Sequence, residues 1–497
     1  MTQLTLVPIF ALLSSMLAAV IIFTLPEERQ RLRTAINLLA ALIKVALVGV
    51  MTWGVLNELD YGLSYEILPG VSFVLQADAL AMMFAGLSAV LWLLTTIYAV
   101  GYLEGSPNRS RFFGFFSLCV ASTMGIALAG NLFTFFLFYE MLTLSTYPLV
   151  VHRGTDKALR AGRNYIIYTL SGGAALLLGM IWLQGLVGDL SFQETGQLKD
   201  VDPALHLPLI LVFGLLVAGL GVKAALFPLH GWLPQAMVAP APVSALLHAV
   251  AVVKAGAFGI VRVVYDLYGI EFATLLGVLQ PLGWLAAFTI IYGSVRALSQ
   301  TDLKRRLAYS TVSQVSYIVL GTAVFGPVGT VGGLVHLLHQ GIMKITLFFC
   351  AGNYAETLGI HKVQELNGAG RRMPLTSAAF TLGAFGMIGA PPLAGFVTKW
   401  TLGSGALNVG MGWVIAVLLV SSLLNAAYFL PVIHRLWFQP EYKWSEQRRW
   451  GRLETHSWLL WPPLITAALT LLAGLFAALP FSPLSWAELI AAREYLP

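Results

Sequence analysis

Apolar runs of about twenty residues recur along most of this sequence, and each is long enough to cross a bilayer as a helix. Hydrophobic residues make up 58% of the 497 residues and charged residues only 10%, whereas soluble domains are about a quarter charged. The sequence therefore predicts an all-α polytopic membrane protein. The fourteen predicted spans are 4–25, 34–56, 73–99, 112–129, 132–151, 164–187, 206–227, 240–264, 272–295, 308–325, 328–351, 375–399, 409–433 and 457–480. The first span lacks a basic leader region and a clear cleavage site, so we interpret it as a retained helix.

The distribution of basic residues supports this number of spans. If the spans alternate in direction, 21 of the 29 Lys and Arg residues fall in loops on one side of the membrane. The opposite side has Lys199 and Arg493, with Arg262 near a span end. By the positive-inside rule the basic loops face the cytoplasm, and both termini face outward. The net charge of +6 is thus a topology signal, and we expect no nucleic-acid partner.

Residues that hold redox or nucleotide cofactors are missing from the sequence. The two cysteines, Cys119 and Cys350, lie within separate spans and are too few for a disulfide framework or an iron–sulfur site. The sequence contains no GxGxxG loop, Walker motif or CxxC pair. We expect no cofactor and no metal site, so the energy source is an ion gradient or a partner subunit.

Several charged residues nevertheless lie inside the predicted spans. The lysines are Lys44, Lys223, Lys254, Lys344 and Lys399. Among the acids, Glu140 is deep in a span and Asp78 is nearer to an end. A charge at mid-membrane costs several kcal/mol, so such residues usually face a bundle interior or a water-filled path. The alternative is a structural ion pair or a side chain that reaches the interface, and this is our interpretation of Lys44.

Lysine, glutamate and histidine together can move protons. A lysine in a low-dielectric environment releases its proton more readily, and a nearby carboxylate opposes that release. A Glu–Lys pair that breaks and re-forms is therefore a proton switch, which we assign to Glu140 and Lys223. Histidines titrate near neutral pH and extend such a relay. The candidate relay residues are His230, His248, His336, His339 and Lys344, although a lone buried histidine is often only hydrogen-bonded.

Prolines indicate where two of the helices are broken. FPLHGWLP ends the seventh span and GMIGAPPLAGFVTKW interrupts the twelfth. Proline removes a backbone donor, and in a membrane this is tolerated where the freed carbonyls line a cavity. Broken helices at corresponding positions of two halves are typical of inverted-repeat transporters. Spans four to eight and nine to thirteen would be the two repeats, with Lys223 and Lys399 in equivalent positions. The predicted segments are 1–100, with three helices; 101–265 and 266–437, the two repeats; and 438–497, a cytoplasmic loop and final helix.

Four motifs carry a family resemblance: FYEMLTLSTYPLV, GVKAALFPLHGWLPQAMVAPAPVSALLHAVAVVKAG, HLLHQGIMKITLFF and GAPPLAGFVTKW. Over about residues 70–435 the chain resembles the antiporter-like subunits shared by respiratory complex I and Mrp-type cation/proton antiporters. The resemblance implies fourteen helices, two inverted five-helix repeats, and broken helices seven and twelve. It also implies a central hydrophilic axis made by Glu140, Lys223, Lys254 and Lys399.

The branch within this family is indicated by Lys399 and by length. The M-type subunit of complex I commonly has glutamate at this position, and the L type has lysine but continues into a long lateral helix. The sequence stops at Pro497, so it is most similar to the D-type subunit of the Mrp antiporter. Hydrogenase-linked complexes and inorganic-carbon pumps use similar subunits.

The resemblance implies an ion-transporter subunit that is not itself an enzyme. We expect a proton-translocating subunit of a multisubunit antiporter in a bacterial plasma membrane, which exchanges external protons for cytoplasmic Na⁺. Its partners would be other membrane subunits and the lipid bilayer. The alternative is an M-type proton-pumping subunit of an NADH:quinone oxidoreductase or of a hydrogenase-linked complex, driven by electron transfer elsewhere. A third interpretation is a scaffold whose charges only hold helices together.

Overall fold

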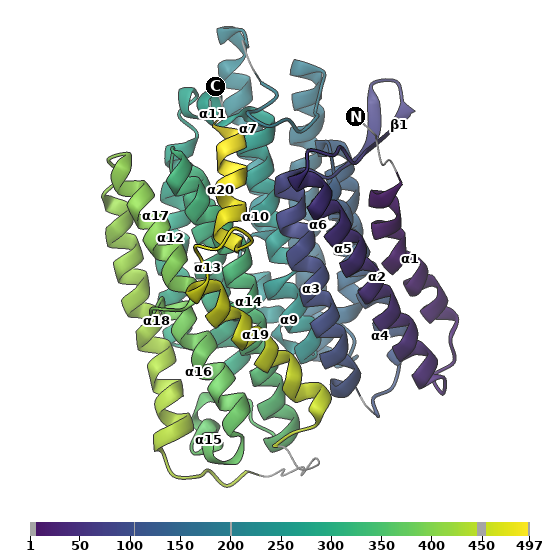
Figure 1. The fold of residues 1–497 in the computed structure, drawn as a ribbon, viewed down its shortest axis with the longest axis vertical. Coiled ribbons are helices and arrows are strands. Elements are labelled where there is room, and N and C mark those ends of the chain that lie inside the picture. Colours follow the sequence, from purple (N-terminus) through teal and green to yellow (C-terminus); the bar gives the residue numbers. More distant parts are fainter. Residues whose placement is uncertain (1–5, 104, 199–200, 445–453, 496–497) are drawn as a thin grey trace.

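The computed structural model describes residues 6–103, 105–198, 201–444 and 454–495. Lys199 lies outside these ranges, as do three of the 21 basic residues counted on the predicted cytoplasmic side, Arg448, Arg449 and Arg452. The molecule is a bundle of helices elongated along one axis (Figure 1).

Within the described ranges, twelve helical segments are long and apolar enough to cross a membrane. These are α1 (Val7–Thr24), α2 (Gln30–Leu56), α3 (Ala79–Tyr102), α4 (Arg109–Leu128), α5 (Leu132–Val150), α6 (Asp156–Val187), α7 (His206–Lys223) preceded by η1 (Pro203–Leu205), α9 (Ala241–Ala249) continued by α10 (Val252–Arg262) and the π-helical η3 (Val263–Tyr268), α12 (Leu279–Leu298), α14 (Pro327–Leu358), α18 (Trp413–Phe438) and α19 (Ser457–Leu475).

Two further segments complete the predicted fourteen. Helix α13 (Leu303–Ala323) has 21 residues, about 31 Å of helix, but it is less apolar because Lys304, Arg305 and Arg306 lie in its first turn. Helices α16 (Pro374–Ile388) and α17 (Ala394–Asn408) are the two halves of the broken twelfth span. The remaining short helices are α8 (Trp232–Gln235), η2 (Ala236–Val238), α11 (Ile270–Leu275), η4 (Val363–Leu366), α15 (Ala369–Arg372) and α20 (Pro483–Glu494).

One element outside the helices was not predicted. Strands β1 (Gly62–Leu68) and β2 (Val71–Gln76) form an antiparallel hairpin between α2 and α3, with Gly62 opposite Gln76. The predicted third span began at residue 73, but helix α3 starts only at Ala79, where the Asp78 carboxylate accepts a hydrogen bond from the Ala81 backbone N–H at 2.7 Å. The alternation in VSFVLQ was hidden in an apolar run, so the sequence favoured an early helix start.

The helix breaks lie close to the predicted positions, with one addition. Helix α7 ends at Lys223, four residues before the end of the predicted span, and residues 224–231 are irregular. The twelfth span is interrupted over 389–393. The eighth span is also broken, between α9 and α10 at residues 250 and 251. Val250 and Ala251 are ordinary residues for a helix, so no sequence pattern indicates this break.

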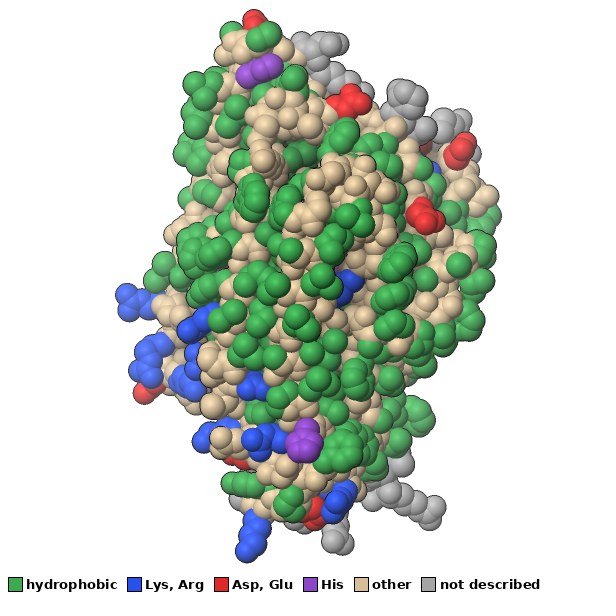
Figure 2. Space-filling model, turned by 90° about the vertical axis from the view of Figure 1, so that its left-hand side faces the viewer, with side chains coloured by type: hydrophobic (Ala, Val, Ile, Leu, Met, Phe, Trp, Pro, Cys, Tyr) green, Lys and Arg blue, Asp and Glu red, His purple; other side chains and the backbone are tan. Residues whose placement is uncertain are grey.

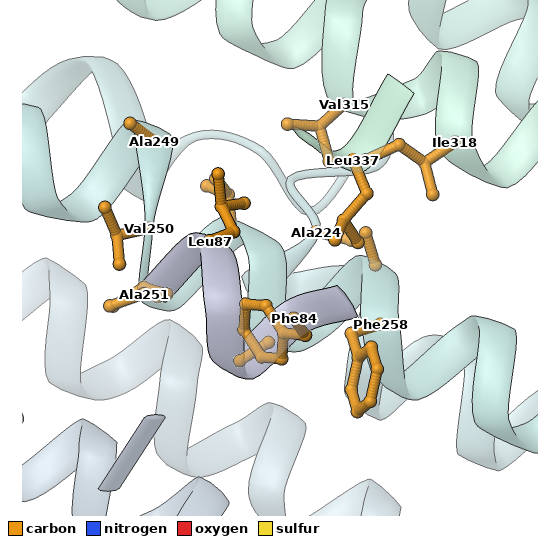
Figure 3. Packing of buried hydrophobic residues seen from close by; sticks show 14 of the residues in the cluster. Phe84, Leu87, Ala224, Ala249, Val250, Ala251, Phe258, Val315, Ile318 and Leu337 are labelled. Carbon is orange, nitrogen blue, oxygen red and sulfur yellow. The ribbon is translucent and has the colours of Figure 1, made fainter. Parts of the chain in front are cut away.

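Two segments run through the centre of the bundle. The most apolar window of Ala241–Tyr268 is completely buried, and 94% of the corresponding window of α14 is buried. Figure 3 shows how these segments pack, with Phe84 of α3 near Phe258 of α10 and Leu337 of α14 near Val315 of α13. Helices α1 and α2 lie at one edge of the bundle and α17 and α18 at the other (Figure 1). Polar groups on the central segments are therefore shielded from lipid.

The two ends of the bundle differ in charge. In Figure 2, Lys and Arg side chains gather toward the lower end of the visible face. Both ends of the described chain lie at the opposite end of the molecule (Figure 1). This arrangement matches the alternating loops that the sequence predicts.

Candidate functional site

Lys223 is the last residue of α7 and is completely buried. Its ammonium donates a hydrogen bond to the backbone carbonyl of Tyr139 on α5 and lies 3.4 Å from the centroid of the Tyr139 ring. The Tyr139 hydroxyl donates in turn to the Gly219 carbonyl at 3.0 Å. A single tyrosine thus fixes the end of α7 and positions its lysine.

Glu140 follows Tyr139 on α5 and is half-buried. It interacts electrostatically with Lys223, but its carboxylate is not among the ion pairs within 4.0 Å that the described residues form. The predicted Glu140–Lys223 pair is therefore a pair of neighbours without direct contact, because consecutive helix residues point about 100° apart and Tyr139 takes the contact position. On the other side, a side chain at Gly173 of α6 would overlap Glu140 Oε1.

Lys254 lies on α10, just after the break in the eighth span, and is completely buried. Its ammonium has no hydrogen-bond partner anywhere in the described chain. Two residues on, a side chain at Gly256 would overlap the backbone of Leu220 and Ala224. This glycine lets α10 approach the end of α7 closely, so Lys254 and Lys223 are carried by helices in backbone contact.

His336 and His339 continue the array on α14, and both are buried. His336 interacts electrostatically with Lys254, with His339 and with Lys399. The His339 Nδ1 lies 3.0 Å from the hydroxyl of Thr398, the residue that precedes Lys399. The amide of the adjacent Gln340 is buried without a protein partner in the described residues. His336 is thus a neighbour of both Lys254 and Lys399, and the role of the two histidines in a relay stays a prediction.

Lys399 lies on α17 beside the break in the twelfth span. Its ammonium donates to the Ile388 carbonyl at 2.6 Å, to the Ser422 hydroxyl at 2.7 Å and to the Met387 carbonyl at 3.3 Å. The Asn425 side chain donates to the same Met387 carbonyl at 3.0 Å. Carbonyls at a helix C-terminus lack partners within the helix and attract cations. Lys399 thus caps α16 across the break.

His248 and Lys344 form a separate group. The His248 ring stacks on Phe348 with centroids 4.5 Å apart, and it interacts electrostatically with Lys344 and Lys304. The Lys344 ammonium donates to Ser310 and to the Leu307 carbonyl on α13. Lys344 therefore faces the basic end of α13 and does not lie between His339 and Lys399. Whether Lys344 takes part in the relay stays a prediction.

His230 lies in the irregular segment after α7. Its ring is 4.9 Å from that of Tyr292 and 5.8 Å from that of Phe227, measured between centroids. It interacts electrostatically with Arg296. The structure places it beside α12 at the basic end, and none of the four axis residues is among these neighbours.

A cavity of about 630 Å³ opens at the basic end of the bundle. Its charged lining residues are Arg153, Lys157, Arg160, Asp302, Lys304 and Arg305. The Lys304 ammonium donates to the Ala239 carbonyl at 2.6 Å. Because Lys304 also interacts with His248, this cavity leads toward the group formed by His248 and Lys344.

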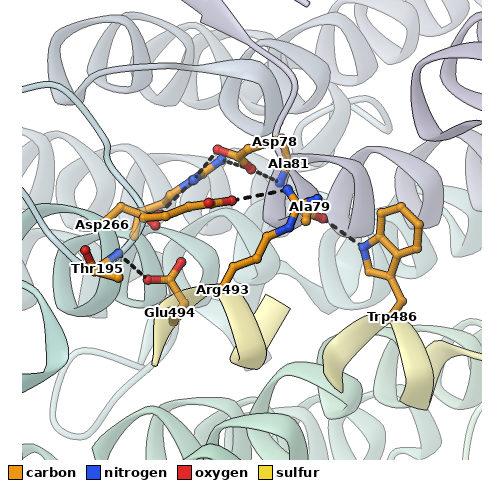
Figure 4. Close-up of polar contacts among 10 residues, drawn as sticks. Asp78, Ala79, Ala81, Thr195, Asp266, Trp486, Arg493 and Glu494 are labelled. Carbon is orange, nitrogen blue, oxygen red and sulfur yellow. Dashed lines mark hydrogen bonds and ion pairs between the residues drawn. The ribbon is translucent and has the colours of Figure 1, made fainter. Parts of the chain in front are cut away.

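Asp78 belongs to an ionic cluster at the opposite end (Figure 4). Arg262 at the end of α10 pairs with Asp78 at 2.7 Å and with Asp266 at 2.8 Å. Asp266 is also hydrogen-bonded to Glu494 of α20. The cluster ties α10 to α3 and α20, which indicates a structural role for Asp78. No group of three or more His, Cys, Asp or Glu residues in the described ranges could hold a metal ion.

Four polar residues in this site were not identified from the sequence: Tyr139, Gln340, Ser422 and Asn425. Tyrosine and serine are common in membrane helices and carry no signal of their own. Gln340 and Asn425 could have been found, because HLLHQGIMKITLFF and VSSLLNAAYFL each place an amide inside a predicted span.

The chain is similar to known proteins over nearly its whole length. Residues 129–425 match the family model described as NADH:quinone oxidoreductase/Mrp antiporter, TM, and residues 70–113 match the one described as NADH-Ubiquinone oxidoreductase (complex I), chain 5 N-terminus. The N-type subunit of the NADH-quinone oxidoreductase of Desulforudis audaxviator is 38% identical over 82% of this chain and 82% of its own length. The D-type subunit of the Na(+)/H(+) antiporter of Bacillus subtilis is 28% identical over 94% of this chain and 93% of its own. A chain of the Mrp complex from Dietzia sp. has the same fold, with a TM-score of 0.85 at 24% identity over 99% of this chain and 97% of that chain.

Proposed function

Since this chain belongs to the family of membrane subunits shared by NADH:quinone oxidoreductases and Mrp antiporters, we propose that it carries protons along its buried row of basic groups. The observation that carries the proposal is Lys254, which is buried at the centre of the bundle with no protein hydrogen-bond partner among the described residues. A permanently charged lysine would be very costly there. A lysine that can release its proton spends part of its time as a neutral amine, which costs less to bury.

The proposed route has Glu140 and Lys223 at one end and Lys399 at the other. Between them the proton passes through Lys254 and then His336 and His339. Buried polar atoms without protein partners need water, and water chains join stations that are too far apart for direct transfer. At each lysine the step is the same, because the ammonium gives a proton to water or imidazole and the neutral amine accepts the next one.

We propose that protons reach the axis from the basic end of the bundle. The 630 Å³ cavity leads to Lys304, and His248 with Lys344 lies beyond it. By the positive-inside rule this end faces the cytoplasm, so both ends of the described chain face outward. The membrane that we propose for this subunit is a bacterial plasma membrane.

The more specific proposal is a Na⁺/H⁺ antiporter subunit of the Mrp type. The similarity to a D-type antiporter subunit over 94% of the chain and the lysine at position 399 support it. The second candidate is a redox-driven proton pump, which the 38% identity to an N-type oxidoreductase subunit favours. Na⁺ needs several oxygen ligands, as other hard cations do. The carboxylate nearest the axis, Glu140, offers at most two, so a Na⁺ site would lie at an interface with another subunit and the chain alone would be inactive.

Lys254→Met in the intact complex tests this function. Proton movement into sealed membrane vesicles is followed with a pH-sensitive dye, after addition either of Na⁺ or of NADH. We expect the variant to assemble and to lose proton movement, while Lys443→Gln, an exposed lysine outside the cavity and the route, behaves as wild type. Full activity of Lys254→Met would refute the axis. A response to Na⁺ alone supports the antiporter, and a response to NADH alone supports the redox pump.

A further inference from the structure

Lys44 lies outside the axis, in the N-terminal helices, and is completely buried. Its ammonium donates to the Ser15 hydroxyl of α1 at 2.5 Å and lies 4.9 Å from the centroid of the Trp92 ring of α3. No carboxylate pairs with it among the described ion pairs. An ammonium has three donors and no acceptor, so one serine does not satisfy it. The interpretation of Lys44 as a side chain that reaches the interface is thereby excluded.

Helix α3 presents a row of polar groups on the face that meets Lys44. Ser88, Trp92 and Thr96 are spaced four residues apart, so they lie on one helix face. All three are completely buried, and the Ser88 hydroxyl, the Trp92 indole N–H and the Thr96 hydroxyl have no hydrogen-bond partner in the part of the chain that is described. Indole N–H is only a donor, and it needs an acceptor when buried.

The polar groups continue from Lys44 toward the basic end of the bundle. Asn37 lies two turns before Lys44 on the same buried face of α2, and its amide oxygen accepts from the Ser117 hydroxyl of α4 at 3.2 Å. One turn further, the Arg33 guanidinium donates to the Ser110 hydroxyl at 2.7 Å and to the Glu27 carbonyl at 3.2 Å. Arg33 is only 2% exposed and closes this end.

Toward the other end the same face of α2 is apolar. Its next buried side chains are Val48, Met51 and Val55. The polar groups therefore extend from one end of the bundle to about its middle and stop there. They lie on α1, α2, α3 and α4. Helix α3, which carries three of them, separates the others from the central helices α9 and α14. Such a one-sided arrangement cannot conduct across the membrane, but it can hold water and one protonatable group.

We propose that α1, α2, α3 and α4 enclose a hydrated pocket, reached from the basic end past Arg33, in which Lys44 is a second proton-binding site. Water in this pocket accepts hydrogen bonds from the Lys44 ammonium and the Trp92 indole, and it exchanges bonds with the hydroxyls of Ser88 and Thr96. Proton exchange moves one proton from the ammonium to water and leaves a neutral amine, and the reverse step restores it. The site is independent of the proposed route through Lys254.

Cysteine labelling of the intact complex tests whether the pocket contains water. In a background with Cys119 and Cys350 replaced by alanine, Asn37→Cys and, separately, Ser117→Cys are exposed to a charged methanethiosulfonate from the basic side of sealed vesicles. Both should react, whereas the buried Val48→Cys and the exposed, apolar Leu39→Cys on the outside of α2 should not. Adding Arg33→Ala should raise the rate about tenfold, because opening then breaks fewer charge-assisted hydrogen bonds. Equal, slow reaction of all four positions with and without Arg33 would overturn the pocket.

Acetylation by acetic anhydride tests the proton-binding site itself, because only the neutral amine reacts and the reagent itself does not titrate. Lys44 is the sole lysine between residues 30 and 56, so mass spectrometry of that segment reports on it alone. We expect the extent of modification to rise with the pH on the basic side and to rise further in Arg33→Ala. A reaction that does not change with pH, or no reaction in the open variant, would overturn the assignment. We expect the same labelling of Lys44 in Lys254→Met, whether or not that variant transports protons. The Lys44 site and the route through Lys254 can therefore be refuted independently.

Discussion

Lys399→Arg separates the helix-capping contacts of this side chain from its proposed role in proton transfer. As a helix cap, Lys399 donates to two carbonyls at the end of α16 and to Ser422. As a proton station, it must also release its proton. Arginine keeps the charge and offers five donors, but it does not deprotonate in proteins.

The magnitudes of the two effects are very different. Each hydrogen bond to a charged group contributes about 1.5–3 kcal/mol, and arginine can replace these bonds, so we expect stability within about 1 kcal/mol of wild type. The ordinary pKa of arginine is about 2–3 units above that of lysine, and each unit corresponds to about 1.4 kcal/mol. If proton release limits the rate, transport should fall by about 100-fold to 1,000-fold.

The assay is the initial rate of dye response in vesicles that contain equal amounts of assembled complex. Lys399→Gln is the matched control, since it loses both the charge and part of the cap. We expect both variants to be defective in transport and only the glutamine variant to melt at a lower temperature. Wild-type transport by Lys399→Arg would refute the argument, because it would show that a fixed positive charge is sufficient.

Neighbouring contacts lead to four further predictions. Glu140→Gln should assemble normally, since no direct ion pair is lost, but proton transport in vesicles should fall at least tenfold if Glu140 controls the proton on Lys223. Gly173→Val should give the same defect through overlap with Glu140 Oε1, and normal transport would show that the carboxylate can move without cost. Tyr139→Phe removes the hydrogen bond to Gly219 and should lower the free energy of unfolding by about 0.5–1.5 kcal/mol, measurable by thermal denaturation of the complex. Burial and the nearby Asp266 raise the pKa of Glu494 to about 10, so its contribution to stability is present below its unfolded pKa and is lost as the pH rises toward 10; Glu494→Gln should abolish that alkaline loss in melting curves.

The sequence was most informative where charge interrupts apolar residues. Glu140, Lys223, Lys254 and Lys399 could be identified because a charge in a membrane span is costly, and that argument needs no structure. Their partners could not be derived. The spacing of two residues on one helix gives the angle between them, but it does not say which neighbouring helix each one faces. Lys344, for example, shares α14 with His336 and His339, but α13 supplies its contacts.

Irregular segments were the other part of the structure that the sequence predicted only in part. The proline-rich motifs predicted the breaks at the ends of α7 and α16, but the break at residues 250 and 251 depends on packing at the centre of the bundle. The position of His230 depends in turn on the path of residues 224–231, which no periodic pattern describes. Lys44 differs from these segments. Its position inside a span was evident from the sequence, but its neighbours on α1 and α3 were not.

The ionic cluster around Arg262 has a mechanical consequence for the axis. Helix α10 is tied at that residue to Asp78 at the start of α3, and its other end is separated from α9 by the break at residues 250 and 251. Helix α10 can therefore tilt about Arg262. Lys254 is eight residues away, about 12 Å along the helix, so a tilt of about 10° would move its ammonium by about 2 Å. Such a displacement is enough to make or break a hydrogen bond. Asp78→Asn weakens the ion pair with Arg262 and should therefore alter proton transport in vesicles, although Asp78 does not lie on the proposed route.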